Sequence, residues 1–186
     1  MKRMMIITLA AAAVALNASP AFAGADAVKL PPYRESTLGN GLRVFVMETR
    51  EVPLVTVALL VPAGSAADDP GSEGIANITG RLLMKGAGGM TADRIAETIE
   101  EAGGAIDVRT GRDYSASYAN FMAKDLERAL DVLSAIALKP SFPEEELARE
   151  KSLVAADIAG AKDNPMALAN REFVRDLAGD HPYAHP

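Results

Sequence analysis

The chain has 186 residues, with 19 basic and 25 acidic side chains, a net charge of −6 and no cysteine. An acidic chain is a poor partner for nucleic acid, and the lack of cysteine excludes a disulfide framework. Stability must therefore come from a packed core, which a chain of this length can supply as one domain.

The first 23 residues have the pattern of a secretory signal peptide. Lys2 and Arg3 precede an apolar, alanine-rich run over residues 4–16, and residues 21–23 form a small-x-small cleavage site. The run is too short for a permanent membrane anchor, although a buried N-terminal helix is an alternative. We expect a periplasmic or secreted mature chain of residues 24–186, with a charge of 17 − 25 = −8 because the signal carries two basic residues and no acidic one. No basic amphipathic helix follows, so we expect no membrane partner after cleavage.

The rest of the chain predicts strands in groups, followed by helices. Strands are expected at residues 33–38, 42–48, 54–61, 105–109 and 114–123, and helices at residues 72–84, 91–102, 124–138, 144–162 and 165–177. Residues 54–61 are nearly all apolar, which indicates a central strand covered on both faces. Grouped strands favour an α+β fold with a mainly antiparallel sheet and helices packed on one face.

Helical spacing also predicts which side chains face the core. The first helix contributes Ile75, Ile78, Leu82 and Leu83, the second Ile95 and Ile99, and the third Leu126, Leu130 and Leu133. Thr91 is the expected N-cap of the second helix.

The most informative segment begins with Gly74-Ile75-Ala76, continues as Asn77-Ile78-Thr79-Gly80-Arg81 and ends with Lys85-Gly86. It resembles the signature of the pitrilysin/insulinase family of zinc peptidases, in which an inverted His-x-x-Glu-His motif lies between such a lead-in and such a turn. Further weak matches, in the same order as in the family, lie at residues 38–44, 142–147, 163–165 and 179–183. The resemblance runs from about residue 37 to the last residue and implies an N-terminal domain of this family.

The resemblance places the third zinc ligand of the family, a glutamate, at Asp157, seven residues after Glu150. These two carboxylates share a helix face. They can form an acidic pair on a solvated face, or they can pair with Arg81. Arg81 in turn can lie exposed, or it can pair with Asp157 where the family holds its metal.

The residues at the motif positions do not suit zinc chemistry. A catalytic zinc needs three protein ligands and a base that activates water. Asn77 is a poor ligand, Gly80 offers no base, and Arg81 carries a permanent positive charge. We therefore expect no catalytic residue, no metal and no cofactor in this chain, with Asn77, Gly80 and Arg81 as degenerate motif positions and Asp157 as a degenerate third ligand.

Other candidate residues are weaker. His181 and His185 are the only histidines, and Pro182 and Pro186 make the helix that could align them unlikely to form, so we expect no metal there. Serine catalysis has no histidine nearby in sequence to act as its base.

The resemblance implies a non-catalytic subunit or domain of a periplasmic peptidase, lacking the His-x-x-Glu-His motif and helping to enclose peptide substrate with an active, zinc-bearing homologous subunit. The alternatives are a stand-alone peptide-binding or scaffold module, and a metallopeptidase with an unusual site. Family subunits repeat the domain and are more than twice as long, so we expect residues 24–186 to be incomplete at the C-terminal end.

Overall fold

The computed structural model describes residues 31–184. The expected signal peptide and His185 lie outside the described residues. The chain divides into two compact units, one ending at Arg50 and the other beginning at Glu51, and each is described by itself.

The described part of the first unit is a β-hairpin. Strands β1 (Tyr33–Thr37) and β2 (Arg43–Met47) lie within the strands predicted at residues 33–38 and 42–48, and they pair antiparallel. Gly41, with φ of 86°, and the side chain of Asn40, which accepts from the Leu42 amide at 3.1 Å, shape the turn.

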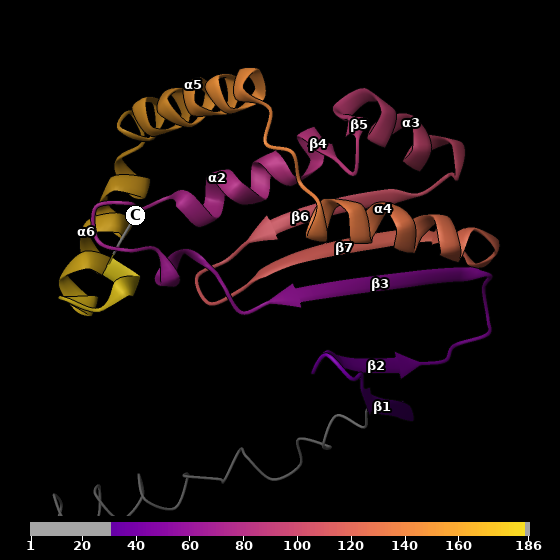
Figure 1. The fold of residues 1–186 in the computed structure, drawn as a ribbon. Coiled ribbons are helices and arrows are strands. Elements are labelled where there is room, and N and C mark those ends of the chain that lie inside the picture. The colour runs from indigo at the N-terminus through magenta and orange to yellow at the C-terminus, as the bar shows by residue number, and fades with distance from the viewer. Residues whose placement is uncertain (1–30, 185–186) are drawn as a thin grey trace, which may run out of the picture. The chain divides into compact units, whose positions relative to one another are not determined.

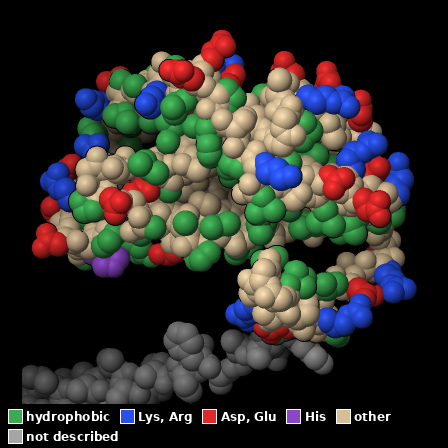
Figure 2. Space-filling model, in the orientation of Figure 1, with side chains coloured by type: hydrophobic (Ala, Val, Ile, Leu, Met, Phe, Trp, Pro, Cys, Tyr) green, Lys and Arg blue, Asp and Glu red, His purple; other side chains and the backbone are tan. Residues whose placement is uncertain are grey.

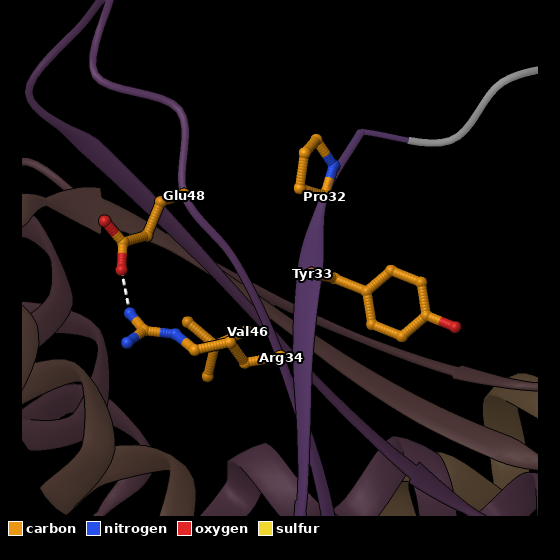
Figure 3. A pocket seen from close by; sticks show the side chains of 5 residues that line it. All are labelled: Pro32, Tyr33, Arg34, Val46 and Glu48. Carbon is orange, nitrogen blue, oxygen red and sulfur yellow. Dashed lines mark hydrogen bonds and ion pairs between the residues drawn. The ribbon is translucent and has the colours of Figure 1, made fainter.

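One side of this hairpin carries a hollow of about 240 Å³ beside the ion pair of Arg34 and Glu48. The Tyr33 ring points away from that pair (Figure 3). Since these groups are exposed, the ion pair contributes little to stability.

The second unit contains an antiparallel sheet with the strand order β3-β7-β6, formed by β3 (Leu54–Val61), β6 (Ala105–Thr110) and β7 (Ser115–Met122). The bounds of β3 match the prediction, but the prediction that it is a central strand covered on both faces is wrong. Among the described strands β3 pairs with β7 alone, and its Leu54 and Leu60 side chains are exposed. The central strand is β7, whose small Ala116, Ser117 and Ala119 are buried. The small side chain of Ala119 lies in the core under the helices and lets a helix approach closely. Small residues give no run of large apolar side chains that the sequence would reveal.

Helices cover one face of this sheet (Figure 1). Helix α3 (Ala92–Glu101) lies on β6 and helix α4 (Leu126–Leu138) on β7, and both share one apolar core with Val55, Val57 and Leu59 of β3. The core of this packing consists of Ala87, Ile95, Ile99, Ala102, Ala119, Phe121, Ala129, Val132, Leu133 and Ile136. The predicted α+β class, with an antiparallel sheet and helices on one face, is confirmed.

Helix α2 (Ile75–Leu82) runs along β6 and continues as the 3₁₀ turn η2 (Leu83–Lys85). A short ladder of β4 (Gly86–Ala87) and β5 (Met90–Thr91) follows, which sequence analysis did not predict. Gly88 and Gly89, with φ of 59° and 83°, make the two-residue turn between its strands. These glycines turn the chain back after the helix has ended.

The prediction of burial is wrong for two residues, Ile75 and Leu130. Ile75 is exposed because α2 begins there, after Gly74 at φ 97°, rather than one turn earlier. Leu130 is exposed because α4 turns its row of Ala129, Val132, Leu133 and Ile136 toward the sheet. Thr91 is confirmed as an N-cap, since its side chain accepts from the Arg94 amide at 3.3 Å.

Two further helices follow α4, helix α5 (Glu144–Ala161) and helix α6 (Pro165–Ala178), close to their predicted bounds. Asn164 caps α6 by accepting from two backbone amides, and Pro165 occupies its first position. The chain then passes through η4 (Pro182–Ala184), and η1 (Ser65–Ala67) and η3 (Ala123–Asp125) are shorter turns earlier in the unit. Acidic and basic side chains are interspersed over the visible face (Figure 2). Within residues 31–184 no helix has the length and apolar character needed to cross a membrane.

Candidate functional site

The degenerate motif lies where α2 meets α5, and these two helices run side by side (Figure 1). The start of α2 is fixed by Asp68, whose carboxylate accepts from the amides of Gly74 and Ala76 at 2.8 and 2.9 Å. A carboxylate at a helix N-terminus satisfies amides that have no partner within the helix. This cap sets the register that brings Asn77 and Arg81 onto the side facing α5.

Arg81 connects the two helices. Its Nε donates to Oδ1 of Asn77 at 3.2 Å, and its Nη2 donates to Oδ2 of Asp157 at 3.0 Å. Its Nη1 lies 3.7 Å from Oε2 of Glu150. The sequence-based hypothesis that Arg81 pairs with Asp157, at the position where the family holds zinc, is therefore confirmed as a contact.

Glu150 is the buried member of this cluster, with 5% of its surface exposed. Its Oε1 lies 3.1 Å from Nζ of Lys85, which also lies 3.9 Å from Glu146. The alternative of an acidic pair on a solvated face is wrong for Glu150, whereas the side chain of Asp157 is 64% exposed. We call Asn77, Arg81, Lys85, Glu146, Glu150 and Asp157 the α2–α5 junction.

The role of Lys85 in this junction was not predicted from the sequence, in which Lys85 belongs to the Lys-Gly turn that follows the motif. The signal available was its spacing, since Lys85 follows Arg81 by four residues and so lies on the same side of a helical segment. Two cations and three carboxylates therefore face one another here, leaving the junction with one net negative charge.

The residues present in the junction do not fit zinc. The Arg81 guanidinium uses the amide oxygen of Asn77 and the carboxylate of Asp157, which are the oxygen atoms a metal would need at these positions. Gly80 is buried and offers no base. Within the described part of the chain, no group of three or more His, Cys, Asp or Glu side chains is arranged to hold a metal ion. That this chain binds no zinc and has no catalytic residue stays a prediction.

The segment around His181 makes structural contacts. Nδ1 of His181 accepts from the Tyr183 amide at 3.2 Å, and the two rings meet edge to face. The Tyr183 hydroxyl donates to Asp113, and the Arg112 guanidinium carbon lies 5.2 Å from the centroid of the Tyr183 ring, within cation–π range. The hydrogen bond to Asp113 raises the pKa of Tyr183 above its ordinary value. These contacts tie the segment after α6 to the turn between β6 and β7.

Comparison with known proteins identifies the family. The profile of the insulinase family (peptidase family M16) matches residues 43–186. The chain belongs to this family. It is 31% identical over 154 residues to a protein of Rickettsia bellii described as an uncharacterized zinc protease, which covers 83% of this chain and 37% of that protein. It is also 31% identical over 124 residues to a probable mitochondrial-processing peptidase subunit beta of Arabidopsis thaliana, covering 67% of this chain and 23% of that one.

Two solved structures have a similar fold. A peptidase M16 inactive domain from Pseudomonas fluorescens is 30% identical and superposes with a TM-score of 0.80, covering 83% of this chain and 38% of that one. A protease from Helicobacter pylori, at 24% identity and a TM-score of 0.77, is similar in fold alone. The chain thus spans under two fifths of the length of these relatives.

Proposed function

We propose that this chain belongs to a non-catalytic subunit or domain of an exported insulinase-family peptidase. It helps to enclose peptide substrate beside a homologous partner that carries the zinc. The observation that carries this proposal is the Arg81 guanidinium, which lies between Asn77 and Asp157 at the position of the family's metal. The resemblance of the fold to a domain described as inactive supports it.

The sheet supports a role in handling peptides. Within residues 31–184 its outer strands β3 and β6 each pair with β7 on one side only, and an outer strand can take up an extended peptide by main-chain hydrogen bonds. The sheet face opposite the helices carries a hollow of about 330 Å³ lined by polar and aromatic side chains: Thr56, Asp107, Arg109, Tyr118 and Asn120. Such a surface contacts peptide without cleaving it.

The test is reconstitution with an intact homologue from the same cell. Each protein is assayed alone and mixed, with an unfolded peptide as substrate and its cleavage as the readout. We expect cleavage to rise on mixing, to survive Arg81→Ala in this chain and to vanish when the glutamate base of the homologue is replaced by glutamine. The reason is that only the homologue supplies zinc and base.

Two other outcomes would replace the proposal. A homologue equally active without this chain would favour a stand-alone peptide-binding or scaffold module. Cleavage by this chain alone, abolished by Asp157→Ala, would favour a metallopeptidase with an unusual site. Recovery of the two proteins as one complex from the native cell would support the proposed partnership.

A further inference from the structure

Position 80, where the family carries its general base, is closed by a residue of strand β6. Gly80 is buried against this strand. A Cβ atom added at Gly80 would lie 2.4 Å from Oγ1 of Thr110, far inside any normal contact distance, and 3.8 Å from Cγ1 of Val108. The obstruction is thus a single hydroxyl oxygen, since Cβ of the same threonine lies at an ordinary 3.7 Å.

The Thr110 hydroxyl is held in place by its surroundings. It donates to the main-chain oxygen of Ala76 on α2 at 3.3 Å, and so it links strand to helix. Oγ of Ser115, which donates to the Ala63 carbonyl at 2.7 Å, lies 3.3 Å from it on the other side. Threonine is also stiff at χ1, because two heavy atoms branch from its Cβ. A side chain at position 80 must therefore break the contact between Thr110 and Ala76.

We infer that Thr110 closes position 80 to any side chain, so that the general base is excluded by strand β6 as well as by the substituted helix α2. The glycine lets α2 approach the strand, and the hydroxyl of Thr110 fastens it there. This inference rests on the proposed function for its meaning, and it predicts that restoring the motif on α2 alone would not rebuild a site. Thr110, which lies 29 positions after the end of the motif in sequence, then helps to determine that no general base can occupy position 80.

A double-mutant cycle on the chain tests the closure directly. Alanine normally stabilises a helix relative to glycine. We expect Gly80→Ala to lower the melting temperature, and we expect the same change in a Thr110→Ala background to raise it relative to Thr110→Ala alone. Gly160→Ala is the matched control, because Gly160 lies in α5 with open space around its Cβ position. It should raise the melting temperature in both backgrounds.

A second measurement uses zinc as the probe. The variant Asn77→His/Arg81→His/Asp157→Glu is titrated with zinc against a competing chelator, then with Gly80→Glu added, and then with Gly80→Glu and Thr110→Ala together. We expect Gly80→Glu to lower the zinc affinity and the melting temperature, and Thr110→Ala to recover both. This readout also serves if Gly80→Ala alone fails to fold.

Two results would overturn the inference. One is a rise in melting temperature for Gly80→Ala equal to that for Gly160→Ala. The other is a loss that persists unchanged after Thr110→Ala, which would place the obstruction elsewhere. Both concern stability and metal binding, so they are independent of whether mixing with a homologue produces peptidase activity.

Discussion

Helices α4 and α5 of the second unit are held by different kinds of contact, one apolar and one charged. Helix α4 lies on β7 through side chains such as Ile136 and Val132, which are almost fully buried. Helix α5 contacts α2 through the charged α2–α5 junction. The apolar contact contains no charges that salt could screen, whereas salt weakens the exposed Arg81–Asp157 pair of the charged contact. The charged contact lies where the family resemblance places a metal with ligands from both helices. In this chain Arg81 and Lys85 supply the positive charge between α2 and α5.

The largest effect should come from the apolar contact. We expect Ile136→Ala to lower the free energy of unfolding by about 2–5 kcal/mol, because it leaves a cavity at a fully buried position. Leu130→Ala, on the exposed side of the same helix, should change it by about 0.5 kcal/mol or less. Urea unfolding of both variants measures the difference. Equal losses would mean that α4 does not lie on the sheet by this face.

The contrast also explains how much of the fold the sequence could predict. The α3 core residues Ile95 and Ile99 were predicted because their spacing leaves one interpretation. On α4, the large Leu130 was predicted to be buried, but the buried residue is its neighbour Ala129. The size of a side chain suggests burial, whereas the small alanine lets the helix pack closely. The position of β3 at the edge of the sheet could not be predicted, since strand order depends on pairing between distant segments and not on the composition of one strand.

The next effect concerns the buried part of the junction. Lys85→Met leaves the Glu150 carboxylate buried, with the Arg81 guanidinium no closer than 3.7 Å. Breaking a buried ion pair by removing one partner costs about 3 kcal/mol, and we expect a loss of this size in the free energy of unfolding. Lys151→Met, an exposed lysine of α5, is the matched control and should change little.

The double variant Lys85→Met/Glu150→Leu separates charge from packing. It should recover most of the lost stability, since neither partner then leaves a buried charge. If the double variant is as unstable as Lys85→Met, the loss comes from the lysine stem and not from the unpaired carboxylate.

Only part of the α2–α5 junction could be predicted from the sequence. The resemblance aligned Asp157 with the third ligand, and helical spacing put it on one face with Glu150. The choice between a solvated acidic pair and a pair with Arg81 needed the distance between two helices that are 76 residues apart in sequence at this point. Lys85 and Thr110 were missed because each acts across a contact between elements, which no local pattern records.

A smaller effect should follow from the exposed part of the junction. The Arg81–Asp157 pair is accessible to solvent, and such pairs contribute about 0–1 kcal/mol. We expect Asp157→Asn to lower the free energy of unfolding within this range at low salt, and the difference from the unchanged protein to vanish at about 1 M salt, where screening is strong. The loss in Lys85→Met should persist at that salt concentration, because its pair is largely buried. An Asp157→Asn loss that is independent of salt would show a role other than ion pairing.

The smallest effect concerns pH at Tyr183. The hydrogen bond to Asp113 raises the pKa of the Tyr183 hydroxyl above the ordinary tyrosine value of about 10. A raised pKa means that the contact is intact at lower pH and is lost as pH rises through the higher, folded-state value. Ultraviolet titration of the unchanged protein minus that of Tyr183→Phe isolates this tyrosine. Asp113→Asn removes the largest cause of the raised pKa, so we expect the Tyr183 transition to move to lower pH in that background. An unchanged transition would show that Asp113 does not hold the segment after α6 in solution.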